Sequence, residues 1–205
     1  MNRVEIKNNA KESLKGNLGE AIKLILILAA IGFVSGMITG IGDANKNDAI
    51  ILLGDFVSFI ATALVSFGSL SFFLKISRNE EVTYKELFSK TDMFIPYIII
   101  SLITGILTIL WSFLFIIPGI IAALSYSQAM LIKLDNPEMD AMECIRESKR
   151  LMNGHKLDYF ILSLSFIGWM ILGIFTFGIL YLWLIPYISV SQANFYNALL
   201  EEKNK

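Results

Sequence analysis

Residues 93–132 read MFIPYIIISLITGILTILWSFLFIIPGIIAALSYSQAMLI, and this stretch contains no Asp, Glu, Lys or Arg. An α-helix rises about 1.5 Å per residue, so about twenty apolar residues cross a hydrocarbon layer of roughly 30 Å. The stretch is therefore long enough for two membrane crossings. Pro118 and Gly119 provide the break that separates them.

The composition of the whole chain agrees with a membrane protein and argues against an enzyme. Hydrophobic residues make up 55% of the 205 residues and charged residues 17%, against about 45–50% and 25% in soluble domains. The net charge of −1 gives no indication of a nucleic-acid partner. With only Cys144 and His155, the usual residues for a zinc site or a Ser-His-Asp triad are missing. We therefore expect no catalytic site, no cofactor and no metal.

Four further apolar runs predict four more crossings, at about 21–41, 49–76, 159–175 and 179–200. We therefore expect an all-α, polytopic integral membrane protein. Its six transmembrane helices would form three helical hairpins in a single membrane domain, 1–205.

An amphipathic helix is predicted before each hairpin, lying on the cytoplasmic membrane surface. The first covers about 2–18 and ends at Gly16 and Gly19, and the second opens near Thr83. The third begins at Asn136-Pro137 and stops at Gly154.

The basic residues predict the orientation of the hairpins. With the N-terminus inside, segments 1–23, 75–90, 133–156 and 203–205 hold sixteen of the seventeen Lys and Arg residues, and only Lys46 lies outside. Short loops rich in Lys and Arg face the cytoplasm. We therefore expect both termini to be cytoplasmic.

A weak internal repeat divides the chain into units of about 1–76, 77–136 and 137–205. SYSQA at 125–129 recurs as SVSQA at 189–193 and, in part, as SLS at 69–71. Such repeats arise by duplication of a stable hairpin, and they also build transport paths at their interfaces. Both readings remain open from the sequence.

Polar residues of the fourth and sixth spans form a candidate cluster in the helix bundle. Its members are Ser125, Tyr126, Ser127, Gln128, Ser189, Ser191, Gln192 and Asn194. Hydrogen bonds between transmembrane helices contribute about 0.6 kcal/mol each on average, so the cluster can act as glue. Alternatively it lines a polar cavity for a small solute or a lipid headgroup.

Two further features have a structural and a functional interpretation. Gly32, Gly36 and Gly40 recur every four residues and form a helix-packing ridge, for the chain's own bundle or for a homodimer. Asp55 lies inside the second span, where it is either solvated at the interface or part of an ion site.

Basic residues of the first and third surface helices form a candidate face for lipid or a partner protein. They are Lys11, Lys15, Arg146, Lys149 and Arg150.

The segment 110–169, which begins LWSFLFIIPGII, and the segment 180–199, LYLWLIPYISVSQANFYNAL, resemble a family of multi-span proteins from Gram-positive bacteria. The family is known as domain of unknown function nine-seven-five. The resemblance covers nearly the whole chain and implies a location in the bacterial cytoplasmic membrane. It implies no catalytic residues.

Two functions follow as hypotheses. The first is a non-catalytic membrane protein that engages lipids or a partner protein through its cytoplasmic interfacial helices. The alternative is a small transporter or channel for a neutral or amphiphilic solute, which requires a hydrated cavity between the fourth and sixth spans. A homo-oligomer is compatible with either hypothesis.

Overall fold

The computed structural model describes residues 2–85 and 93–203, and these residues are helical apart from turns and short connections. The helices are α1 (Arg3–Ala44), α2 (Asp48–Ser77), α3 (Phe94–Leu114), α4 (Ile116–Tyr126), α5 (Ala129–Asp135), α6 (Ala141–Leu151), α7 (Lys156–Leu164), α8 (Ile167–Phe175) and α9 (Tyr181–Lys203). The predicted all-α class is confirmed.

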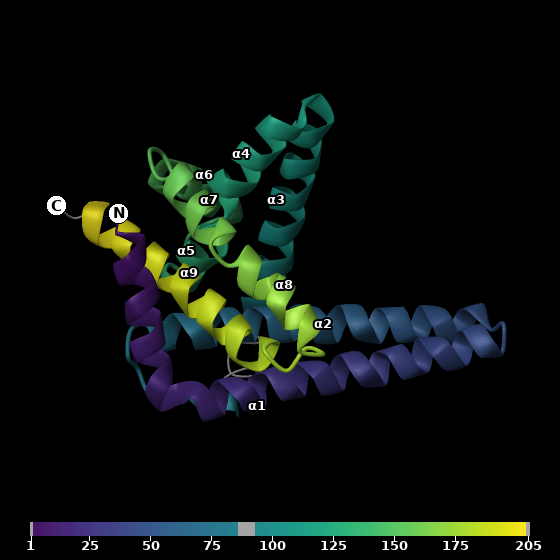
Figure 1. Ribbon diagram of the computed structural model, residues 1–205. Coiled ribbons are helices and arrows are strands. Elements are labelled where there is room, and N and C mark those ends of the chain that lie inside the picture. The colour runs from purple at the N-terminus through teal and green to yellow at the C-terminus, as the bar shows by residue number, and fades with distance from the viewer. Residues whose placement is uncertain (1, 86–92, 204–205) are drawn as a thin grey trace.

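The helices form three antiparallel hairpins: α1 with α2, α3 with α4, and α7–α8 with α9 (Figure 1). In the first turn, the Asn47 side chain caps α2 by accepting hydrogen bonds from the N–H groups of Ala49 and Ile50. In the last turn, Phe177 and Gly178 both have a positive φ, of 51° and 84°. This tight turn lies where the sequence predicts it.

Within the described residues, five helical stretches are long and apolar enough to cross a membrane: α1, α2, α3, Ile116–Asp135 and Lys156–Phe175. The last two each combine two helices, α4 with α5 and α7 with α8. These stretches indicate a multi-pass membrane protein. The sixth predicted crossing, α9, is not among them, because its apolar residues are interrupted by Ser189, Ser191, Gln192, Asn194 and Asn197.

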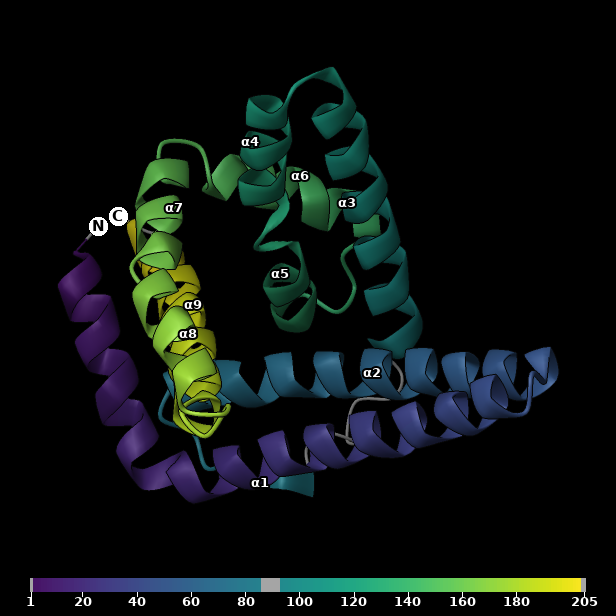
Figure 2. The ribbon, with the colours of Figure 1, turned by 45° about the vertical axis from the view of Figure 1, so that its right-hand side comes forward.

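The three hairpins diverge instead of lying side by side. Their tips point in different directions, and the two chain termini lie close together in both views (Figures 1 and 2). Two regions result. We call the buried region the junction, which comprises 3–25 of α1, 65–77 of α2, α5, α6 and α9. We call the exposed apolar parts of the hairpins the limbs, residues 26–64, 94–124 and 167–180.

The junction contains most of the hydrophobic core. Leu24, Phe72, Ile132 and Phe195 come from four different helices and are all essentially inaccessible to solvent. The limbs instead expose large apolar side chains such as Phe113. A soluble protein does not leave so much contiguous apolar surface exposed, whereas lipid covers it in a membrane protein. The side chains of the limbs therefore do not fix the angles between the hairpins.

Two predicted helix boundaries differ from the observed ones. The helix predicted from Asn136-Pro137 begins instead at Ala141, because the Lys133 ammonium donates to the carbonyls of Pro137 and Met139 at 2.7 and 2.6 Å and holds this segment outside the helix. In the opening stretch, the break between α3 and α4 occurs at Phe115, three residues before the predicted Pro118. Pro118 lies in the first turn of α4, where no backbone donor is lost.

The first surface helix also differs from the expectation. Gly16 and Gly19 lie within α1, which is continuous from Arg3 to Ala44 but bends in its first half (Figure 2). The apolar stripe Ile6, Ala10 and Leu14 is buried in the junction. It packs against protein and does not lie on a bilayer.

Of the other two predicted surface helices, the structure describes the third, as α6, but little of the second. In α6, the apolar positions Cys144, Ile145 and Leu151 are buried in the junction core. The predicted second surface helix, with its capping box from Thr83 to Glu86, lies largely outside the described residues.

Candidate functional site

A small cavity of about 110 Å³ lies in the junction between α2, α5, α7 and α9. Serine and glutamine side chains supply most of its polar lining, and they are Ser66, Ser69, Ser127, Gln128, Ser189 and Gln192. Tyr159 of α7 completes the polar wall. The cavity thus brings together polar residues from all three units of the predicted repeat, including four of the eight residues predicted to cluster in the bundle.

Gln128 is the most deeply placed polar side chain of this cavity, with an exposed fraction of 1%. Its amide nitrogen donates to Ser127 Oγ at 2.8 Å, and its backbone N–H donates to Ser148 Oγ at 3.1 Å. Its carbonyl oxygen, Oε1, has no hydrogen-bond partner among the described residues. A buried carbonyl without a donor costs about 1–3 kcal/mol, so Gln128 is unusual among buried polar groups.

Ser148 explains why Gln128 is held at this position. The Ser148 hydroxyl of α6 donates to the Ser125 carbonyl at 2.8 Å while it accepts from the Gln128 backbone. These two bonds connect α6 to the turn between α4 and α5, where the helical hydrogen-bond ladder is interrupted. The sequence motif SYSQA therefore marks a helix break as well as a polar wall.

The other members of the predicted bundle cluster have local roles. The hydroxyls of Ser125 and Ser191 donate to carbonyls one turn earlier in their own helices. Tyr126 is half-buried and lines a different groove. The Asn194 amide lies within 3.4 Å of polar backbone atoms of α1 and α2, so it ties α9 to the first hairpin.

A second concave site, a groove of about 310 Å³, lies between the α3–α4 hairpin and the α6–α7 segment. Its apolar wall includes Trp111, Pro118 and Ile121, and two cations, Lys149 of α6 and Lys156 of α7, line it as well. Neither of these two ammonium groups makes a hydrogen bond or an ion pair with a residue that the structure describes. The groove therefore combines apolar surface with two cations that the rest of the described chain does not neutralise.

The five residues of the predicted lipid or partner face differ in their surroundings. Lys15 and Arg146 are exposed, and Lys149 lines the groove just described. The Lys11 ammonium lies 5.6 Å from the centroid of the Tyr187 ring. Arg150 pairs with Glu147 through two hydrogen bonds of 2.9 Å.

The Glu147 carboxylate is the centre of a small charge network. It also accepts a 2.9 Å hydrogen bond from Lys203, the last described residue of α9. The hydrogen bond from Arg150, followed by that from Lys203, lowers the pKa of the Glu147 carboxyl, although partial burial opposes the shift. The network ties the end of α9 to α6.

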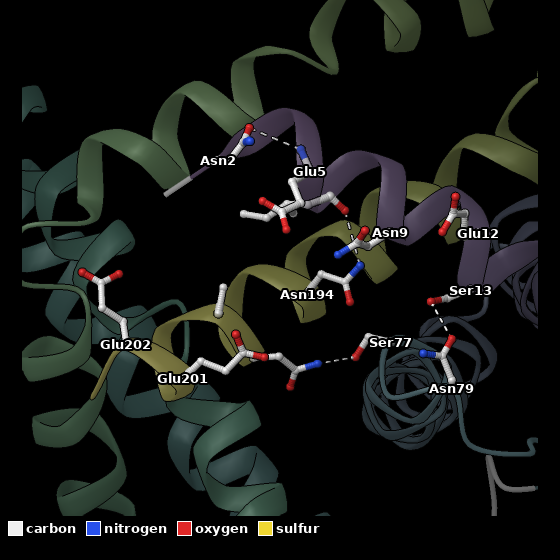
Figure 3. Close-up of a pocket in the computed structure, with 13 residues that line it drawn as sticks. Asn2, Glu5, Asn9, Glu12, Ser13, Ser77, Asn79, Asn194, Glu201 and Glu202 are labelled. Carbon is white, nitrogen blue, oxygen red and sulfur yellow. Dashed lines mark hydrogen bonds between the residues drawn. The ribbon is translucent and has the colours of Figure 1, made fainter. Parts of the chain in front are cut away.

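A third site is an open, acidic pocket of about 600 Å³ beside the chain termini. Figure 3 shows Glu5 and Glu12 of α1 on one side and Glu201 and Glu202 of α9 on the other. Two hydrogen bonds brace its floor, from Ser13 to Asn79 at 2.9 Å and from Asn197 to Ser77 at 3.0 Å. The sequence analysis missed this pocket, because its acidic residues come from opposite ends of the chain.

The remaining candidates from the sequence stay apart from these sites. Gly32, Gly36 and Gly40 are exposed, and a Cβ added at any of them meets open space. The first hairpin closes instead at Gly42 and Gly54, where an added Cβ would come within 2.8 Å of the facing helix.

The titratable candidates are also separate from the polar cavity. Asp55 is exposed and lines a wide groove between α2 and α3. Cys144 is fully buried, and this burial raises the pKa of its thiol. His155 lies 3.7 Å from Glu202. Among the residues described, no group of three or more His, Cys, Asp or Glu side chains could hold a metal ion.

Comparison with known proteins identifies a family. The sequence model described as Protein of unknown function (DUF975) matches residues 1–125 and 114–203, which together cover nearly the whole chain. No curated protein and no solved structure matches the sequence.

Proposed function

The chain belongs to the DUF975 family, whose function is unknown, and from this premise we propose that it is a non-catalytic protein of the bacterial cytoplasmic membrane that binds anionic lipid headgroups on the cytosolic side. The observation that carries the proposal is the groove in which Lys149 and Lys156 accompany an apolar wall. The proposal has two parts, the arrangement in the membrane and the lipid site.

The arrangement that we propose has six crossings, with the three limbs in the bilayer. The helices α5 and α7 and the first half of α9 would complete the crossings, and the rest of the junction would lie at the cytosolic surface. The support for this arrangement is the position of the basic residues, since sixteen of seventeen lie in segments that would face the cytoplasm. The α9 helix would be the sixth crossing, and its polar residues Ser189, Gln192 and Asn194 turn toward protein partners. Both termini would then be cytosolic.

In a bilayer, the limbs would lie closer to parallel than they do in Figure 2. Each limb would then bury its exposed apolar side chains in hydrocarbon. Two limbs have an interruption at or near their base, at Ser127–Gln128 and at Ser165–Phe166, where the helix can change direction. These interruptions make the reorientation compatible with an intact junction.

The surface helices would reach lipid through their polar faces. Because the apolar stripes of α1 and α6 are already buried in the junction, they cannot insert into the membrane. The contact that remains available is electrostatic, from basic side chains to anionic headgroups. Each Lys or Arg near an anionic surface contributes about 1 kcal/mol to such binding.

The groove has the features that one anionic phospholipid requires. Lys149 and Lys156 lie in segments predicted to be cytosolic, at the level of the headgroups. From Tyr126 to Pro118, α4 rises away from this level, and Ile121 and Trp111 extend the apolar wall in the same direction. A phosphate group would pair with the ammonium groups while an acyl chain follows α4. Such a basic pocket between helices is a known mode of lipid recognition.

Quenching of Trp111 fluorescence tests this proposal directly, because Trp111 lines the groove. Trp169 and Trp183 are replaced by Phe so that only Trp111 reports. The protein is then titrated with phosphatidylglycerol or phosphatidylcholine whose acyl chains carry bromine. We expect phosphatidylglycerol to quench at lower concentration.

Removing the two positive charges of the groove should abolish the preference for phosphatidylglycerol over phosphatidylcholine in the quenching of Trp111. Lys149→Gln and Lys156→Gln should each reduce it about fivefold, which corresponds to about 1 kcal/mol per lysine. Lys15→Gln and Arg146→Gln remove the same charge from exposed positions outside the groove and should reduce the preference less than either groove variant does. Equal quenching by the two lipids would contradict the proposal. If the two lysine variants kept the preference for phosphatidylglycerol and lost only the binding of an acidic protein, the groove would bind a partner protein and not a lipid.

The alternative function, a small transporter or channel for a neutral or amphiphilic solute, has one observation in its favour. The polar cavity lies between the fourth and sixth predicted spans, where a solute site is required. Its volume of about 110 Å³ is too small for an amphiphile. Uptake of small neutral solutes into liposomes that contain the protein tests the alternative, and uptake equal to that of empty liposomes would contradict it.

A further inference from the structure

The polar cavity of the junction has an unmet hydrogen-bonding requirement. Gln128 Oε1 is buried and lines the cavity without a donor among the described residues. The Gln192 amide of α9, which has two donors of its own, also lines the cavity and makes no hydrogen bond with a residue that the structure describes. The cavity therefore offers one free acceptor, from the turn before α5, and a free donor group from α9.

The hydroxyl groups around the cavity can complete the contacts to a ligand. Ser69 donates to the Ser66 carbonyl at 2.8 Å, and Ser127 donates to the Leu124 carbonyl at 2.9 Å. Each hydroxyl that donates its proton still has an oxygen that accepts. A small polar molecule inside the cavity would thus meet several partners, which is what a buried water needs to be stable.

The lining determines the charge of a ligand. Among the described residues that line the cavity there is no Asp, Glu, Lys or Arg, and the apolar ones are Leu70, Phe73, Leu131 and Ala193. An ion transferred into such a place would lose its hydration without gaining a counter-charge, which is very costly. The ligand is therefore uncharged.

The volume determines its size. One water molecule in the liquid occupies about 30 Å³, so a cavity of about 110 Å³ has room for a few waters or one small solute. We propose that this cavity is a binding site, built by all three repeat units, for a small uncharged molecule that donates a hydrogen bond to Gln128 Oε1 and accepts one from Gln192. Water and small amides or alcohols share this chemistry.

An experimental structure of the protein in lipid nanodiscs, resolved well enough to show waters, distinguishes the two sources. Separate peaks within hydrogen-bonding distance of Gln128 Oε1 identify water. One continuous feature identifies a bound solute. A cavity without density, or one closed by the side chains around it, would overturn the proposal.

A pair of variants gives an independent test through thermal stability. Ala193→Val adds methyl groups to the cavity and removes no polar group. If the cavity holds a ligand, this substitution displaces it, and Tm should fall by about 2–4 °C or more. If the cavity is empty, filling it should raise Tm instead, and this result would overturn the proposal.

The matched control and the solute arm complete the test. Ser191→Ala removes a buried hydroxyl that bonds within its own helix and does not line the cavity, and its Tm should respond to added solute as that of the wild type does. Formamide, acetamide and methanol at non-denaturing concentrations should raise the Tm of the wild type but not of Ala193→Val if the natural ligand is a solute. No response to any of them, together with a lower Tm of Ala193→Val, assigns the site to water.

Discussion

Large apolar side chains are buried in one region of this molecule and exposed in the other, and single helices pass through both regions. In α1, Leu24 is 0% exposed in the junction, whereas Phe33 in the limb is 70% exposed. In α2, Phe72 is 0% exposed and Phe56 is 64% exposed. An apolar side chain in a membrane protein therefore does not by itself indicate a protein core. The junction is stabilised by packing of the chain on itself, and the limbs are stabilised by lipid.

The largest effect that follows from this comparison is a difference between two phenylalanines of α2. Phe72→Ala creates a cavity in the junction and should cost about 3–5 kcal/mol of unfolding free energy. Phe56→Ala shortens a side chain that faces lipid and should cost less than about 1 kcal/mol. Unfolding by SDS in mixed micelles measures both. Equal losses would mean that α2 is packed by protein along its whole length.

A second, smaller difference concerns the acidic residues. Asp135 in the junction accepts two hydrogen bonds from Arg78, at 2.8 and 2.6 Å, and one from the Tyr196 hydroxyl at 3.1 Å. Asp135→Ala removes these three hydrogen bonds and should cost about 1.5–3 kcal/mol. Asp55→Ala, on an exposed limb position, is the control and should change the unfolding free energy little. A larger effect at Asp55 would instead indicate a buried partner for this carboxylate.

Within one limb, Gly54 and Gly36 should respond differently to substitution. Gly54→Leu forces a side chain against Thr39, whose Oγ1 would lie 2.8 Å from the new Cβ, and should cost about 1–3 kcal/mol. Gly36→Leu enters open space and should leave the stability of the monomer unchanged. Light scattering of the purified protein then tests the ridge of Gly32, Gly36 and Gly40. A dimer that dissociates only in Gly36→Leu would show that the ridge is a homodimer seam.

The smallest effect is the pH dependence of the junction. Because the folded state lowers the pKa of Glu147, its ion pairs stabilise the protein fully above the unfolded pKa of about 4.3 and lose this contribution as the pH falls through the folded value. The contribution is up to about 1 kcal/mol. Glu147→Gln should therefore flatten the decline of Tm between about pH 5 and pH 3. A decline as steep as that of the wild type would exclude Glu147 as its source.

The sequence predicts those features that depend on local chemistry. Apolar runs locate α1, α2 and α3, and the turn at Phe177 and Gly178 follows from its glycine. The match of residues 1–125 and 114–203 confirms the family. The recurrence of SxSQ also led to Gln128 and Gln192, which line one cavity. Local chemistry is sufficient in these cases, because a turn or a motif contains its own signal.

The sequence fails where the result depends on the partner of a surface. The periodicity of Ile6, Ala10 and Leu14 indicates an amphipathic helix, but the same pattern fits a bilayer or a protein core. Likewise, a glycine repeat predicts close packing, whereas the close approach occurs at Gly54, which belongs to no repeat. The sequence also does not predict the basic groove, because Lys156 and Trp111 come to line the same groove only through the tertiary fold.

The most direct test of the account is the sidedness of the three hairpin tips. Single cysteines at Asn45, Phe115 and Phe177 are introduced into a Cys144→Ser background, together with cysteines at Lys15 and Arg146, which the proposed arrangement places on the cytosolic side. A membrane-impermeant thiol reagent is then added to intact cells. We predict that the three tips are labelled from outside and that the two junction positions are labelled only after the cells are opened. A tip that reacts only from the cytosolic side would contradict an arrangement in which all three limbs cross the membrane from one junction.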